Sequence, residues 1–292
     1  MVETPALLAP PRIRQVASWI LRLAVAGSCL GLARIMIETY SPVNSLLYIE
    51  WQLLSEGAAN AIDTYGGWLL VGLAALALCW PHPAITTAIA FYFFVFAVAT
   101  TLIGSGMSWR PTGWNRLEVV AIAAHATRYV APLALGALWW TNRRRVQTRG
   151  RGVEWLLRIA AAATFAAHGL EAIWQHPTFK DYLIVAADSF LSADLPERIA
   201  GYMLYVIGAI DLLVAALILG VRWRWVAGYM AAWGVITAGA RIIHGGFDAW
   251  QEFAIRLANS AVPLSLLILW WPAPSIAQSV QPAQDTSPRV QT

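Results

Sequence analysis

The sequence predicts an all-α, polytopic membrane protein whose eight transmembrane helices form two parallel four-helix repeats. The first observation is composition: of the 292 residues, 59% are hydrophobic and 12% are charged, and the mean hydropathy is +0.57. Soluble domains are about one quarter charged. Because so few charged residues cannot cover a soluble surface, we expect an integral membrane protein. The second and third observations are long apolar runs and an internal repeat.

Segments of the first half of the chain recur in the second half at a nearly constant spacing. The offset is 136 positions for three segments, as from Leu21 to Leu157, and 131 positions near the end of each half, as from Pro132 to Pro263. The matched segments are 21–23 with 157–159, 46–49 with 182–185, 68–72 with 204–208, and 130–133 with 261–264. Such self-similarity indicates an internal duplication, so we expect two copies of one structural unit.

Eight apolar runs approach the length of about 20 residues that a helix needs to cross a bilayer. The second run is short, and we expect its helix to begin inside the preceding loop. The eight predicted spans lie near 16–37, 66–80, 84–105, 118–140, 153–174, 201–220, 224–244 and 251–271. Because each half holds an even number of spans, the two halves have the same orientation, unlike the inverted repeats of many transporters.

The distribution of arginine predicts the orientation and the division of the chain. Residues 1–140 form the first repeat, 141–152 a basic cytoplasmic linker with five arginines, and 153–271 the second repeat. Arginines also precede the first span, whereas the loop after it carries four acidic residues and no Lys or Arg. Both termini are therefore expected in the cytoplasm. The tail 272–292, rich in Pro, Gln, Ser and Thr, is expected to be disordered.

Two further features concern local structure. The outer loops contain apolar-patterned stretches at 45–54 and 182–191, which we expect to form short helices at the membrane interface. Pro132 and Pro263 lie at matched positions inside the fourth and eighth spans. Each removes one backbone hydrogen bond, so we expect a kink in both helices.

Ionisable side chains inside the apolar runs are the candidate functional residues, because burying them in hydrocarbon is costly. The second half carries seven, and the predicted topology places all of them in the outer half of the membrane. They are His168 and Glu171 on the fifth span, Asp211 on the sixth, Arg241 and His244 on the seventh, and Glu252 and Arg256 on the eighth. We expect these seven to form one ligand-binding site. The mixture with arginine argues against a metal site.

Asp211 is expected to form an ion pair, and several of the seven residues also have a purely structural explanation. Asp211 must meet a cation or be protonated, and Arg241 or Arg256 is the expected partner. Structural explanations remain open: Glu252 and Arg256 have the spacing of an ordinary helix-start pair, and His244 precedes two glycines and can end a helix. A structural salt bridge is the alternative for Asp211.

The first half carries a smaller set of ionisable residues. Glu118, His125 and Arg128 lie on the fourth span. Ala75 stands at the position that matches Asp211, and Leu32 at the position that matches His168. We therefore expect the second half to keep the site and the first half to have diverged or to act as a scaffold.

The second half also resembles a known family. The fifth span begins with Leu-Arg-Ile at 157–159 and ends with His168-Gly169, and an acidic residue, Asp211, lies in a Gly- and Leu-rich sixth span. In these motifs residues 153–271 are similar to the DoxX-like family of small four-helix bacterial membrane proteins. The first half resembles the family only through the duplication. Two departures are that Asp211 replaces a Glu and that Glu171 stands where Lys is common.

The resemblance implies a four-helix unit in the bacterial inner (plasma) membrane, and some relatives are linked to quinone-dependent sulfur oxidation or to membrane redox complexes. The partners to expect are lipid, other membrane subunits or a quinone. The clustering of basic residues in short loops does not indicate a nucleic-acid partner.

Three functions remain open, and with them the question whether the protein is an enzyme. The first, which we favour, is a non-catalytic accessory or scaffold subunit, or a small-solute carrier that uses a path between the repeats. The second is a quinone-linked redox subunit, in which Arg241 and Arg256 hold oxygen atoms while His168 and Asp211 handle protons. The third is a haem b carrier with His168 and His244 as axial ligands.

Overall fold

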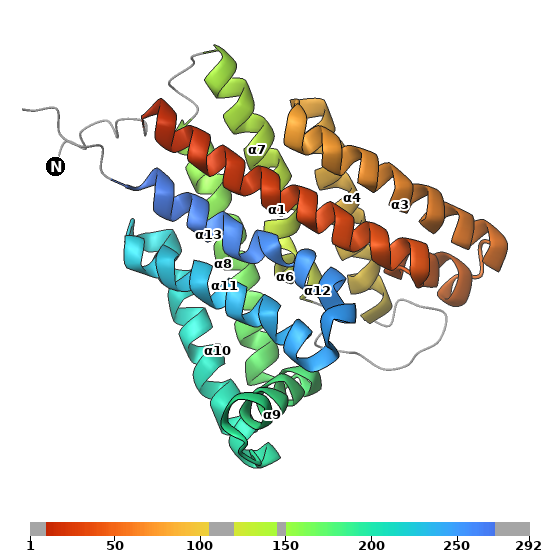
Figure 1. The fold of residues 1–292 in the computed structure, drawn as a ribbon, viewed down its shortest axis with the longest axis vertical. Helices are drawn as coiled ribbons and strands as arrows, with labels where there is room; N and C mark the ends of the chain where they lie inside the picture. The colour runs from red at the N-terminus through yellow and green to blue at the C-terminus, as the bar shows by residue number, and fades with distance from the viewer. Residues whose placement is uncertain (1–9, 105–119, 145–149, 272–292) are drawn as a thin grey trace, which may run out of the picture.

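The computed structural model describes residues 10–104, 120–144 and 150–271, and within these ranges it is helical and contains no strand (Figure 1). Six helices are long and apolar enough to cross a membrane, and a bent pair makes a seventh if it counts as one span. These findings confirm an all-α chain with the helices of a polytopic membrane protein. Part of the linker 141–152, the tail 272–292 and Glu118 lie outside the described residues, as does the beginning of the predicted span 118–140.

Among the described residues, eight helices form the bundle, four from each half of the chain. In the first half they are α1 (Pro11–Glu38), α3 (Glu56–Cys79), α4 (Pro83–Gly104) and α7 (Ala126–Arg144), and in the second half α8 (Gly150–Ile173), α10 (Glu197–Gly220), α11 (Arg224–Gly245) and α13 (Leu257–Leu269). The remaining elements are α2 (Pro42–Asn44), the π-helical η1 (Ser45–Glu50), α6 (Ala121–Ala124), α9 (Pro177–Leu191), the 3₁₀ turn η2 (Phe247–Ala249) and α12 (Trp250–Ala254). As expected, the second long helix begins inside the preceding loop, where Ser55 Oγ accepts from the Ala58 amide at 3.4 Å.

The eight bundle helices form two layers. One layer runs in the order α3, α1, α13 and α11, which lie side by side in Figure 1, and the other runs α4, α7, α8 and α10. Across the layers, α1 packs on α7 and α13 packs on α8, whereas α3 touches α4 and α10 touches α11 less closely. The middle of the bundle is therefore closed and its two edges are looser.

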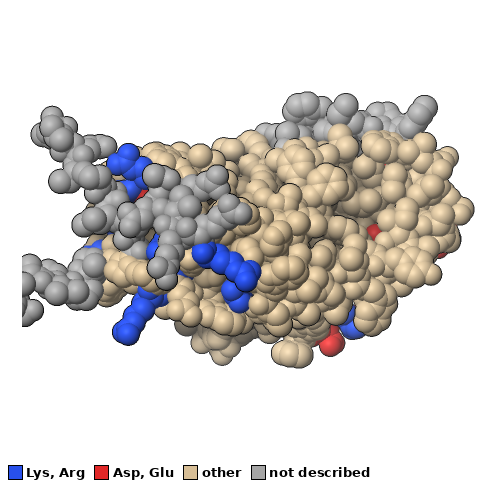
Figure 2. Space-filling view, turned by 90° about the horizontal axis from the view of Figure 1, so that it is seen from above, with Lys and Arg blue, Asp and Glu red and all other residues tan. Residues whose placement is uncertain are grey.

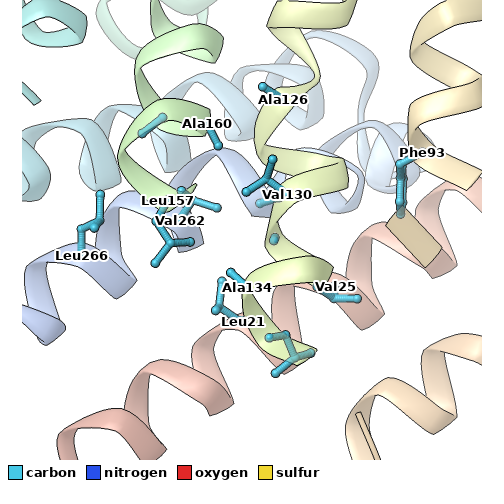
Figure 3. Packing of buried hydrophobic residues seen from close by; sticks show 14 of the residues in the cluster. Leu21, Val25, Phe93, Ala126, Val130, Ala134, Leu157, Ala160, Val262 and Leu266 are labelled. Atoms are coloured by element: carbon cyan, nitrogen blue, oxygen red, sulfur yellow. The ribbon is translucent and has the colours of Figure 1, made fainter. Parts of the chain in front are cut away.

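The hydrophobic core lies where the four middle helices meet. Figure 3 shows Leu21 and Val25 of α1, Val130 of α7, Leu157 of α8 and Val262 of α13 in this cluster. Within the 18-residue apolar stretch of each helix, the buried share is 56% in α1 and 61% in α8, against 28% to 39% in α3, α4, α10 and α11. The peripheral helices thus turn much of their apolar surface outwards.

The exterior is apolar over a wide area, as a lipid-facing surface requires. Phe91, Val206 and Trp225 are 66%, 61% and 81% exposed. Figure 2 shows most of one face without charged side chains, with Lys and Arg gathered mainly towards one end.

The last helix of each half is broken, but not at the proline where the kink was predicted. Pro132 lies inside α7 and Pro263 inside α13. Ahead of each proline the chain makes a tighter turn, in which the carbonyl of His125 or of Arg256 accepts from the amide three residues later, at 2.9 Å in both cases. In the second half the bend is 49°. The breaks lie about two turns before the prolines.

The two interfacial segments cover the looser edges of the bundle. The predicted helix at 182–191 is confirmed and is longer, since α9 begins at Pro177; it packs on α11 and α10. The segment predicted at 45–54 forms η1 and, with α2, packs on α4 and α3. Asp63 of α3 anchors this segment by accepting from the amide and the hydroxyl of Ser41, at 2.9 and 2.7 Å.

Candidate ligand-binding site

Two adjoining cavities lie at the end of the bundle that α9 covers. The larger, which we name the apolar cavity, has a volume of about 330 Å³. Its walls come from α8, α9, α10 and α11 and from the break before α13. They include Phe165, Phe179, Leu183, Phe190, Leu204, Ile207, Trp233, Ile236 and Ile243, with His168, Asp211, Arg241 and Arg256 as ionisable side chains.

The smaller cavity, which we name the polar cavity, has a volume of about 230 Å³ and lies between the two halves. Its ionisable lining residues are His125, Arg128, His168, Glu171, His176, Arg241 and Arg256. The two cavities share five lining residues, namely His168, Phe179, Tyr182, Arg241 and Arg256. Together they form one site with an apolar end and a polar end.

The structure brings five of the seven sequence-predicted residues to these cavities and leaves two outside. His168, Glu171, Asp211, Arg241 and Arg256 line one cavity or both.

The remaining two residues have other contacts. Glu252 lines neither cavity, and its carboxylate pairs with Arg256 one turn later, which is the helix-start pair given as the structural alternative. His244 is exposed on the last turn of α11, and its ring meets Tyr182 edge-on at 5.2 Å. Because His168 lines the cavities and His244 does not, the geometry gives no support to axial haem ligation by this pair.

Residues of the first half complete the polar cavity, which corrects the expectation that the site belongs to the second half alone. His125 and Arg128 reach it from the break between α6 and α7. A signal was present in the sequence, since His125 stands 131 positions before Arg256 and both occupy the helix breaks. The packing of α7 on α8, which joins the halves, was not readable from either half alone.

Polar contacts connect the two broken helices beneath the site. The Thr127 hydroxyl donates to Asn259 Oδ1 at 2.6 Å, and the Thr127 amide donates to Thr164 Oγ1 at 3.1 Å. Thr164 and Asn259 also line the apolar cavity. These buried bonds hold α7, α8 and α13 in fixed register, so the side chains above them are positioned by rigid elements.

The charged groups of the site are unevenly paired. His168 Nδ1 lies 2.8 Å from Glu171 Oε2, and Arg256 pairs with Glu252. Arg241 donates to the Thr237 carbonyl, and its guanidinium lies 4.9 Å from the centre of the Tyr182 ring.

Arg128 and Arg241 have no carboxylate partner among the described residues. Both are buried, with 5% and 8% exposed. The Nε atoms of Arg128, Arg241 and Arg256 are all buried without a hydrogen-bond partner in the described part of the chain. The polar end of the site therefore presents positive charge and free N–H groups.

Asp211 forms no ion pair within the described residues, so the expected bond to Arg241 or Arg256 was wrong. The side chain is 3% exposed, has Trp233 as a hydrogen-bond partner, and leaves Oδ1 unpartnered in the described structure. Arg241 donates instead to the Thr237 carbonyl of its own helix, and Arg256 pairs with Glu252 one turn away.

The His-Gly motif has a packing role beside its polar one. A Cβ atom on Gly169 would lie 2.9 Å from the carbonyl oxygen of Gly208, and one on Gly208 would lie 2.6 Å from that of Gly169. The absence of side chains at both positions lets α8 and α10 touch through their backbones. This close contact brings His168 and Asp211 into one cavity wall.

His176 lines the polar cavity from the segment between α8 and α9. It precedes α9, and its ring stacks on Phe179 with centroids 4.7 Å apart. Burial lowers the pKa of this imidazole below its ordinary value, so it is neutral at pH 7. His176 therefore adds no positive charge to the polar cavity at that pH.

A comparison of the chain with models of known protein families, with curated proteins and with solved structures finds no match.

Proposed function

We propose that the chain is a DoxX-like membrane protein of eight spans in two parallel repeats, and that it binds a small ligand within the membrane as a solute carrier or as an accessory subunit of a membrane assembly. The observation that carries the proposal is the pair of adjoining cavities, one apolar and one lined by arginines without carboxylate partners. Ligand sites are typically concave, largely apolar and provided with a few convergent polar groups.

Contacts at matched positions support the two-repeat arrangement. The Ser28 hydroxyl of α1 lies 3.3 Å from the Ala254 carbonyl in the second half. The Thr164 hydroxyl of α8 lies 3.4 Å from the Ala123 carbonyl in the first half. Thr164 follows Ser28 by 136 positions and Ala254 follows Ala123 by 131, which are the two offsets of the sequence repeat. Each half thus contacts the other in the same way, as two parallel copies do.

A second pair of contacts supports the same arrangement. Arg22 stacks on Trp19 at 4.7 Å, and Arg158 stacks on Trp155 at 4.3 Å, one repeat later. Each guanidinium also donates to a carbonyl in the last turn of the second long helix of its half, at 2.7 Å in both cases. These arginines lie at the basic end of the bundle, which we assign to the cytoplasmic side of the bacterial inner membrane.

One observation favours a quinone-linked redox subunit as a second candidate. Arg241, Arg256, His168 and Asp211 all line the apolar cavity. These are the residues that a quinone needs for its carbonyl oxygens and for proton transfer, within walls suited to an aromatic ring. Electrons would come from a partner subunit, since the sequence has no Gly-x-Gly-x-x-Gly or Walker motif.

The experiment that tests the proposal is an analysis of what the protein retains. The full chain is purified in mild detergent, its oxidised and dithionite-reduced spectra are recorded, and its organic extract is analysed by mass spectrometry. We expect a small molecule that is retained by the wild type and depleted in Ala240→Trp, which fills the apolar cavity. Gly239→Trp is the matched control, because a side chain there enters open space. A retained quinone would favour the redox subunit, and equal retention by both variants would contradict the proposed site.

A further inference from the structure

The charge balance of the polar cavity indicates the chemistry of its ligand. The polar cavity is lined by three arginines, Arg128, Arg241 and Arg256, whereas the carboxylates in or beside it are Glu171 and Glu252. Arg256 pairs with Glu252, so that Arg128 and Arg241 are buried cations that form no ion pair with a carboxylate in the described structure. An unpaired buried charge is strongly unfavourable unless an opposite charge and hydrogen bonds compensate it. An anionic ligand supplies both.

The free donors of the cavity converge as an oxyanion requires. The Nε atoms of Arg128, Arg241 and Arg256 are buried and unpartnered among the described residues, and all three side chains line the polar cavity. Arginine recognises carboxylate and phosphate oxygens through charge-assisted, often bidentate hydrogen bonds. A neutral carbonyl compound accepts such bonds but leaves the excess positive charge of the site uncompensated.

The apolar cavity continues from the same arginines. Arg241 and Arg256 line both cavities, so a headgroup bound to them can extend an apolar chain between Phe165, Leu204 and Trp233. A volume of about 330 Å³ lies at the small end of the range for ligand sites, roughly 300 to 1,000 Å³, and fits one chain better than two.

The mouth of the apolar cavity opens on the exterior of the bundle. Phe190, Ile236 and Ile243 line the cavity and are 70%, 58% and 37% exposed. They come from α9 and α11, at the edge of the bundle where α9 packs over α10 and α11. In a membrane-spanning chain this edge faces lipid, so the ligand has a route from the bilayer into the site.

We infer that the site binds a single-chain amphipath with an acidic headgroup, which enters from the bilayer between α9 and α11. The headgroup, a carboxylate or a phosphate, lies against Arg128 and Arg241, and the chain fills the apolar cavity. This inference rests on the proposed function and specifies its ligand; it also makes the first half of the chain part of the site through Arg128.

The test is a binding assay on the purified full chain in detergent. The probes are the fluorescent fatty acid cis-parinaric acid, its methyl ester, and decylubiquinone; lysophosphatidate and inorganic phosphate serve as competitors. We expect the acid to bind, the ester to bind at least about tenfold more weakly, and lysophosphatidate to compete. Competition by inorganic phosphate at similar concentrations would show that a free anion, and not an amphipath, is the ligand, and would overturn the inference.

Substitutions in the protein distinguish recognition of the ligand's headgroup from binding of its apolar tail. Arg128→Gln and Arg241→Gln should each lower the affinity for the acid by about tenfold and leave the affinity for the ester unchanged. Arg34→Gln, which removes an exposed arginine paired with Glu38, is the control. Should one Gln variant fail to fold, Arg241→Lys keeps the charge but loses bidentate geometry and should give a smaller loss.

The outcomes distinguish the two proposals. Equal affinity of acid and ester, or insensitivity of the acid to both arginine substitutions, would overturn the acidic headgroup while a bound probe still supported an intramembrane ligand site. Failure of the acid, the ester and decylubiquinone to bind would contradict the proposed function itself.

Discussion

The two halves of the chain differ most at the positions that line the apolar cavity. When α4 and α11, both 22 residues long, are aligned end to end, Phe93 stands opposite Gly234. Leu32 stands opposite His168 by the repeat offset. Phe93 and Leu32 are 2% and 0% exposed and belong to the hydrophobic core. In the proposed two-repeat arrangement, packed side chains in the first half therefore correspond to a cavity in the second.

A second comparison concerns two buried arginines of similar exposure. Arg158 is 4% exposed and donates to the carbonyls of Ile218 and Leu219, and Glu154 lies 3.6 Å away. Arg128 is 5% exposed and has no such partners among the described residues. Arg158 thus caps a helix end through hydrogen bonds to its carbonyls, whereas Arg128 lines a cavity. Burial alone does not separate structural from ligand-binding residues, but the count of satisfied donors does.

The largest expected effect comes from making the second half resemble the first. In Gly234→Phe, a Cβ atom would lie 2.9 Å from the Asn259 carbonyl oxygen and Ser260 nitrogen, so α11 must separate from α13. We expect a loss of roughly 3 kcal/mol or more in the free energy of unfolding, measured by denaturation in detergent. Gly239→Phe, in open space, should be nearly neutral. A stable Gly234→Phe protein would show that the two helices are not held at this contact.

Replacing Arg158 or Arg128 by methionine should change the free energy of unfolding in opposite directions. Arg158→Met leaves Glu154 with Arg222 and Trp270 but exposes two helix carbonyls, so we expect a loss of about 3 kcal/mol in unfolding free energy.

In the ligand-free protein, Arg128→Met removes an uncompensated buried charge, so we expect a gain of about 1 kcal/mol. Comparing the unfolding free energies of the two delipidated variants with the wild type checks both signs. A large loss in Arg128→Met would reveal a structural ion partner for this side chain.

Asp211→Asn should change stability only slightly, which sharpens the contrast between Asp211 and the paired carboxylates. Because Asp211 has no ion pair in the described structure, its neutralisation should alter the unfolding free energy by less than about 1 kcal/mol. Glu154→Gln, at a carboxylate that accepts from Arg222 at 2.7 and 2.6 Å, is the matched comparison and should cost more. Equal costs would mean that Asp211 has a cationic partner after all.

The smallest expected effect is a pH dependence from His176. Burial lowers its folded-state pKa, so the unfolded chain takes up a proton first as the pH falls below the ordinary value of about 6.5. Stability contributed by neutral His176 is therefore present at pH 7.5 and declines towards pH 5. His176→Gln should lose less stability over this interval than the wild type, by about 1 kcal/mol or less, in paired thermal scans. Parallel losses in both proteins would assign the acid sensitivity to other groups.

Much of the architecture was predictable because local rules decide it. Apolar composition and run length determine the long helices, and the pattern at 182–191 determines α9. The two prolines pointed to the correct helices but not to the positions of the breaks, which lie at His125 and Arg256. The cost of burying charge pointed to His168, Asp211 and Arg241 before any contact was known.

The tertiary structure alone decided how these residues combine. His125 and Arg128 join the site because α7 of the first half packs on α8 of the second. Asp211 has no cation partner among the described residues, since Arg241 donates to the Thr237 carbonyl of its own helix and lies over the Tyr182 ring of α9. Spacing along a helix determines which side chains share a face. Whether a side chain keeps such a local partner or binds a group on another helix is decided only once the helices have packed.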